Sequence, residues 1–113
     1  MIATNFEEFV VKLAEEAPHS VVLDWFRRLD LTIRDYRKTQ GIHLRSKHTS
    51  ESIIACDPLL GRNVADTIAK LRKVRNDVAH KDMQVSSETA IEYARQCLSL
   101  IGVIWKAQDA HAA

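Results

Sequence analysis

The chain has 113 residues, 46% hydrophobic and 27% charged, which is enough for one domain with a modest core and too few for two. Its 16 Lys and Arg nearly balance its 15 Asp and Glu, so the formal net charge is +1. Any contact with nucleic acid must therefore come from a local basic patch. Only three Gly and two Pro are present, a composition that is poor in turn residues and predicts an all-α fold.

Cys56 and Cys97 form no Cys-x-x-Cys motif and no Cys and His cluster at metal-binding spacing. The pattern predicts two reduced, buried thiols, no metal site and no cofactor. Residues 1–11 lack the basic start and apolar run of a signal segment, and no stretch approaches the length of a membrane span. We therefore expect a cytoplasmic protein that does not enter a membrane.

Two helices are expected in the first part of the chain. Thr4 and Glu7 have the spacing of a capping box, which predicts a helix over residues 5–16. Apolar residues then recur every three or four positions over residues 20–40 and predict a long second helix. Gly41 provides the C-terminal stop of this helix.

The second part of the chain predicts two more long helices. Residues 41–61 lack a sustained period and predict a long loop, within which residues 50–54 could form a short extra helix. An apolar stripe predicts a helix over residues 62–80. The last helix is expected to begin at Ser86 and to fray from about residue 107.

These elements predict one domain over residues 1–113. The number and lengths of its helices are typical of an up-and-down four-helix bundle. Between Leu98 and Trp105 the last helix is apolar around much of its circumference, more than one face of a small bundle can bury. Such a surplus often marks an interface with a partner, so we expect a homodimer.

The most informative stretch ends the third long helix and reads Arg75-Asn76-Asp77-Val78-Ala79-His80. Arg75 falls on the apolar arc of this helix, so it needs a carboxylate partner or a cleft where an anionic ligand neutralises it. Asn76 and His80 are one turn apart and share a face. The second helix offers three candidate carboxylates for Arg75, namely Asp24, Asp30 and Asp35.

These three residue types can cleave RNA without a metal ion, because RNA supplies its own 2′-hydroxyl as the nucleophile. His80 can act as general base or acid near neutral pH, and Arg75 can stabilise charge on the phosphate. Asn76 can orient the 2′-hydroxyl or a phosphate oxygen. Nearby basic residues predict either an RNA-binding track or a solvated face; these are Arg72, Lys73 and Lys81.

The stretch Arg75 to His80 resembles the Arg-x4-6-His signature of HEPN domains, including the polar residue after the Arg, and the expected helical layout is similar to theirs. The resemblance implies a homodimer in which two copies of the motif meet in a cleft. It also implies metal-independent endoribonuclease activity through Arg75, Asn76 and His80, with 2′,3′-cyclic phosphate as the product end.

A role as a toxin or defence protein follows from the same resemblance, with RNA as the substrate and an antitoxin or other inhibitory protein as a further partner. Asp82 stands where one branch of the family has a Tyr that is modified, so inhibition by that route is not expected.

Two other functions stay open from the residues alone. A non-catalytic HEPN-like module would bind a nucleotide or a protein and serve as a dimerisation unit. A helical interaction protein without a ligand would use Arg75 in a structural ion pair. Replacement of His80 discriminates among them, because only an enzyme has cleavage to lose.

Overall fold

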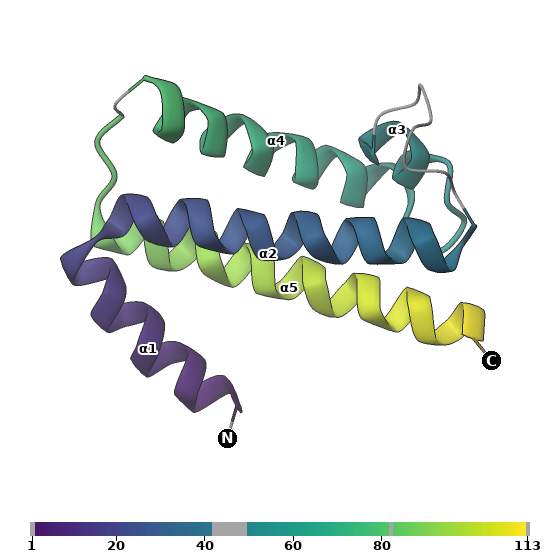
Figure 1. Cartoon of the computed structure of the whole chain (residues 1–113), viewed down its shortest axis with the longest axis horizontal. Helices are drawn as coiled ribbons and strands as arrows, with labels where there is room; N and C mark the ends of the chain where they lie inside the picture. Colours follow the sequence, from purple (N-terminus) through teal and green to yellow (C-terminus); the bar gives the residue numbers. More distant parts are fainter. Residues whose placement is uncertain (1, 42–49, 82, 113) are drawn as a thin grey trace.

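The computed structural model describes residues 2–41, 50–81 and 83–112, and all the regular structure within these ranges is helical. The helices are α1 (Ile2–Glu16), α2 (Pro18–Thr39), α3 (Ser50–Ala55), α4 (Gly61–His80) and α5 (Ser87–Ala112) (Figure 1). The predicted all-α class is confirmed. Within the described ranges, no helix is both long and apolar enough to cross a membrane.

The core lies around α2 and α5, which run side by side in the same direction (Figure 1). α1 packs against this pair on one side, and α4 packs on α2 from the other side. α3 packs against α4. The central pair supplies many of the largest fully buried side chains, among them Leu29, Ile33, Tyr36, Cys97 and Ile104.

Several predicted helix ends are confirmed. Gly41 follows α2 with a φ of 72°, a conformation that favours glycine, and its N–H donates to the carbonyl of Lys38 at 3.0 Å. Ser86 caps α5, because its Oγ accepts a hydrogen bond of 3.1 Å from the backbone N–H of Thr89.

The predicted helix over residues 62–80 corresponds to α4, and the short extra helix corresponds to α3. Of the predicted loop, residues 42–49 lie outside the described residues, as does Asp82.

The start of the first helix and the end of the last helix differ from the prediction. α1 begins at Ile2, so Thr4 lies inside the helix and the capping box there is wrong; Ala3 before it is the strongest helix former. α5 does not fray from residue 107 but continues to Ala112. It does so because Ala107 is buried and because His111 contacts Asp57 in the turn before α4.

The expectation of two buried thiols holds for one cysteine. Cys97 is buried in α5 and free, and burial raises the pKa of its thiol to about 12. Cys56 is free but exposed, because it lies in the turn that follows α3 rather than on a packed helix face.

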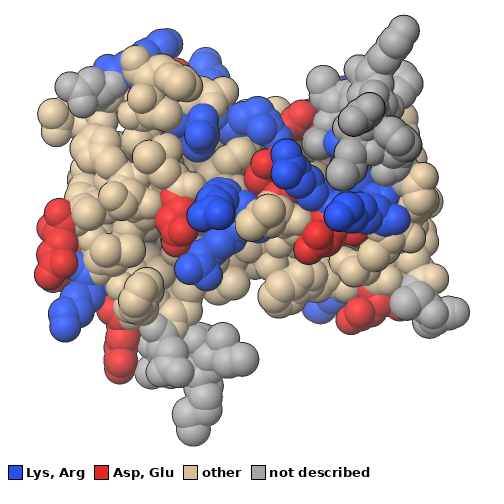
Figure 2. Space-filling model, viewed as in Figure 1, with Lys and Arg blue, Asp and Glu red and all other residues tan. Residues whose placement is uncertain are grey.

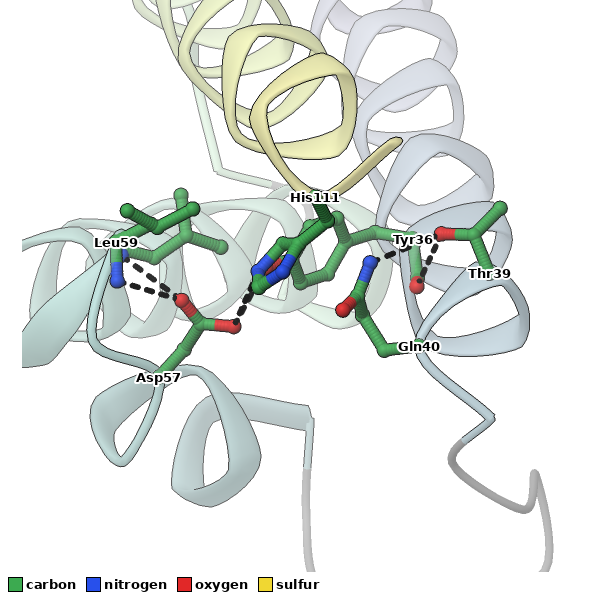
Figure 3. Close-up of polar contacts among 7 residues, drawn as sticks. Tyr36, Thr39, Gln40, Asp57, Leu59 and His111 are labelled. Atoms are coloured by element: carbon green, nitrogen blue, oxygen red, sulfur yellow. Dashed lines mark hydrogen bonds and ion pairs between the residues drawn. The ribbon is translucent and has the colours of Figure 1, made fainter. Parts of the chain in front are cut away.

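A polar cluster of Tyr36, Asp57 and His111 joins the ends of α2 and α5 to the turn before α4 (Figure 3). Tyr36 donates a hydrogen bond of 2.5 Å from its hydroxyl to Oδ2 of Asp57. Oδ1 of Asp57 accepts from the backbone N–H groups of Leu59 at 2.8 Å and Leu60 at 3.2 Å. His111 Nε2 lies 3.9 Å from Oδ2 of the same carboxylate. One carboxylate therefore holds three parts of the chain together.

Both tyrosines of the chain use their hydroxyls in this way. Tyr93 of α5 donates to the backbone carbonyl of Leu71 in α4 at 2.6 Å. Burial raises the pKa of both Tyr93 and Tyr36 well above the usual value of 10.0, and the neighbouring Asp57 raises that of Tyr36 further. The folded state therefore favours neutral phenols.

We expect this preference to destabilise the protein at alkaline pH. Below about pH 10 both phenols are neutral in the folded and unfolded states, and above it the unfolded chain ionises first, so the free energy of unfolding falls. In a titration, tyrosinate absorbance should rise only as helical circular dichroism is lost. The alkaline loss should be shallower in Tyr36→Phe, which has one fewer such group. Tyrosinate forming in a fully helical protein would contradict the prediction.

Candidate functional site

A groove of about 600 Å³ lies between α2 and α4. Its volume is within the range of sites that bind small molecules. In the space-filling view, basic and acidic side chains alternate across the middle of this face of the molecule (Figure 2). The charged and amide residues that line the groove are Asp24, Arg27 and Asp30 of α2 and Arg72, Arg75 and Asn76 of α4. The structure thus brings two of the three predicted catalytic residues to one concave surface.

Arg75 is half-buried on the groove side of α4. Its Nη1 donates to Oδ1 of Asn76 at 3.2 Å, and among the described residues it has no carboxylate within 4.0 Å. An amide oxygen carries no net charge, so this contact does not neutralise the guanidinium. Of the two arrangements expected from the sequence, Arg75 adopts the one that faces a cleft.

Arg72, one turn earlier on α4, is in the opposite situation. Its Nε donates to Oε1 of Glu51 in α3 at 2.7 Å, and its Nη2 lies 3.6 Å from Oδ1 of Asp30 in α2. The guanidinium also lies 5.0 Å from the centre of the Phe26 ring. Arg72 therefore connects three helices, and its predicted role in RNA binding is not favoured by this pairing.

The carboxylates predicted as partners of Arg75 are engaged elsewhere or point away. Asp24 pairs with Arg28 one turn along α2 at 3.1 Å, and Asp30 pairs with Arg72. Asp35 is exposed and does not line the groove. Both carboxylates of the groove thus have an arginine partner other than Arg75.

His80 is exposed at the last residue of α4 and does not line the groove. Five residues along a helix correspond to about 140° of rotation and roughly 7.5 Å of rise, which separates it from Arg75. Lys81 follows it and lies 3.3 Å from Asp77, whereas Lys73 is exposed beside a neighbouring hollow. Within one chain, Arg75 and Asn76 are together and His80 is apart.

Arg27 is the groove residue that sequence reasoning missed. It extends from α2, is exposed, and has no ion pair within the described ranges. It belongs to an Arg27-Arg28 pair, and only the packing of α2 against α4 decides that Arg27 borders the groove while Arg28 lies over the Trp25 ring. No sequence signal separates the two arginines.

Among the described side chains, no group of three or more His, Cys, Asp or Glu is placed to hold a metal ion. Comparison of the chain with protein-family models, with the sequences of curated proteins and with solved structures finds no match.

The Arg72 bridge should contribute to stability. In Arg72→Met an unbranched aliphatic side chain is kept, while the guanidinium over Phe26 is lost and Glu51 and Asp30 lose their partner. Because the Arg72 side chain is 35% exposed, we expect the free energy of unfolding to fall by only about 1 kcal/mol. Urea denaturation measures this change, with Lys73→Met as the matched control on the exposed side of α4. Equal midpoints for the two variants would show that the bridge contributes nothing.

Proposed function

We propose that this protein is a metal-independent endoribonuclease of the HEPN type, a four-helix bundle with α3 as an added short helix. The observation that carries the proposal is Arg75, the motif arginine. It is half-buried and faces a groove, and no described carboxylate neutralises it. Partly burying an unpaired guanidinium is unfavourable, and an RNA phosphate would offset that cost through charge-assisted hydrogen bonds.

The proposed reaction is an attack of the RNA 2′-hydroxyl oxygen on the adjacent phosphorus. The bond from phosphorus to the 5′-oxygen breaks, which leaves a 2′,3′-cyclic phosphate and a 5′-hydroxyl. His80 takes the proton from the 2′-hydroxyl or returns one to the leaving oxygen, and Arg75 stabilises the charge on the phosphate. Asn76 accepts from Arg75 with its amide oxygen, so its NH₂ group remains to orient a phosphate oxygen.

A homodimer would complete the site. Because His80 does not line the groove of its own chain, we propose that a second protomer supplies it across a two-fold axis. Large exposed apolar side chains support an interface between copies: Phe9 is 62% exposed and Trp105 is 59% exposed. Trp105 belongs to the stretch of α5 that is apolar beyond the needs of the core.

The biological setting proposed is that of a cytoplasmic toxin or defence protein. An antitoxin or other inhibitory protein would hold the enzyme inactive by covering the groove or by separating the protomers. This part of the proposal rests on the HEPN resemblance of the motif.

A second candidate is a non-catalytic HEPN-like module that binds a nucleotide or a protein. The observation that favours it is the separation of His80 from Arg75 within one chain. In such a module the groove would hold a phosphate through Arg75 and Asn76 without breaking a bond.

The two candidates differ in an RNA cleavage assay. Wild type incubated with total RNA in EDTA should yield fragments ending in 2′,3′-cyclic phosphate, and Arg75→Ala and His80→Ala should each lower the rate at least about 100-fold. Arg62→Ala, an exposed arginine at the start of the same helix, is the matched control and should retain the rate. Intact RNA with a folded, dimeric wild type would overturn the enzyme in favour of the binding module.

A composite site also predicts complementation. If each site takes Arg75 from one protomer and His80 from the other, mixing the two inactive variants regenerates intact sites in the heterodimers. Half of the dimers are then mixed with one good site each, so about a quarter of wild-type activity should return after exchange of protomers. No recovery in a sample whose heterodimers are confirmed by native mass spectrometry would place each site within a single chain.

A further inference from the structure

We propose that the groove between α2 and α4 is a two-sided clamp for the phosphates of a single RNA strand, with Arg27 of α2 as a second anchor opposite Arg75 of α4. The choice of RNA as the ligand rests on the proposed function. The clamp itself rests on the distribution of charge in the groove.

The groove contains three guanidinium groups and two carboxylates, yet these do not cancel locally. Arg28 engages Asp24 at 3.1 Å from outside the groove lining, and Arg72 engages Asp30 at 3.6 Å. Glu51 at 2.7 Å completes the neutralisation of Arg72. With both carboxylates occupied, Arg27 and Arg75 are left as the cations without a described anionic partner.

These two cations lie on different walls of the groove, since Arg27 comes from α2 and Arg75 from α4. An anion lying between the walls can be contacted from both sides, which a single surface arginine cannot do. Guanidinium groups bind phosphate oxygens through paired N–H donors, so two of them favour a polyanionic strand over an isolated carboxylate.

The rest of the groove suits a strand with sugars and bases. Leu23, which is 36% exposed, lines it next to the charged residues and offers apolar surface, whereas Phe26 is buried beneath the Arg72 guanidinium. Grooves that bind single strands combine a cationic track with surface on which sugars or bases pack.

Binding of a fluorescein-labelled, single-stranded RNA octamer tests the clamp. Fluorescence anisotropy is measured in a His80→Ala background, so that the RNA stays intact. Arg27→Ala and Arg75→Ala should each weaken binding about ten-fold, as expected for the loss of a charge-assisted phosphate contact. Each should also reduce the slope of log K against log[salt] by about 0.7, the value for one phosphate of a single strand.

Arg34→Ala is the matched control. Arg34 lies two turns further along the same face of α2, is exposed, and does not line the groove. Its replacement should change the dissociation constant less than about two-fold, because a distant exposed charge is screened by salt. Circular dichroism of each variant verifies that the fold is kept.

Two binding results would overturn the clamp. If Arg27→Ala binds the octamer like the control while Arg75→Ala is weakened, Arg75 acts alone. If inorganic pyrophosphate binds with dependence on both arginines but the RNA does not, the groove serves a free phosphate compound and not a strand.

The clamp and the enzyme can fail separately. Binding that depends on Arg27 and Arg75, without cleavage by wild type, supports the clamp and rejects the endoribonuclease. Cleavage that depends on His80, with octamer binding indifferent to Arg27, rejects the clamp and leaves the enzyme in place.

Discussion

The position of α4 depends on its buried apolar face, which includes Ile68, Leu71 and Val78, and on one arginine that is neutralised from two directions. α4 is loosely packed against α5 but packs directly on α2, and Arg72 adds a link between the groove walls because it reaches both Asp30 of α2 and Glu51 of α3. Its guanidinium also covers the Phe26 ring, so the ion pairs sit above an apolar surface and are partly shielded from water. Tyr93 adds a buried hydrogen bond from α5 to the backbone of the same helix. These polar contacts add to the apolar packing that holds the helix carrying the motif.

The difference between Arg72 and Arg75 follows from this arrangement. The two side chains have the same chemistry and are about one turn apart, yet one is held by two carboxylates and the other by an amide oxygen. Asp30 cannot serve both equally, and its pairing with Arg72 leaves Arg75 available to a ligand. Because the nearby carboxylates pair with Arg72, Arg72 forms a structural ion pair and Arg75 remains a candidate cation for binding a ligand.

The sequence was most informative where a local pattern decides the structure. Apolar periodicity located α2 and α4. The predicted helix stop at Gly41 was correct, because glycine readily adopts the positive φ that this position has. The predicted end of the last helix was wrong, because His111 of α5 contacts Asp57, a residue far away in the chain. Local propensity cannot include such a contact.

The same limit applied to the groove. Helical projection showed that Arg75 needed an anion, but it could not choose between a carboxylate of α2 and a ligand, because that choice depends on the partners of Asp24 and Asp30. Arg27 was missed because its role depends on which side of α2 meets α4. The motif residues could therefore be picked out from the sequence. Which charged groups around them pair with each other could be determined only from the packed structure.

The separation of His80 from the groove would give the proposed enzyme a particular form of control. If Arg75 binds phosphate in one chain and His80 arrives from the other, RNA binding needs only the groove, while cleavage needs the assembled pair. The exposed apolar residues Phe9 and Trp105 lie outside the groove lining, so a surface involved in assembly can be separate from the surface that contacts RNA. An inhibitory partner would then have no need to enter the groove. By covering the apolar surface it would keep the protomers apart and remove the histidine, while each chain retained its affinity for the strand.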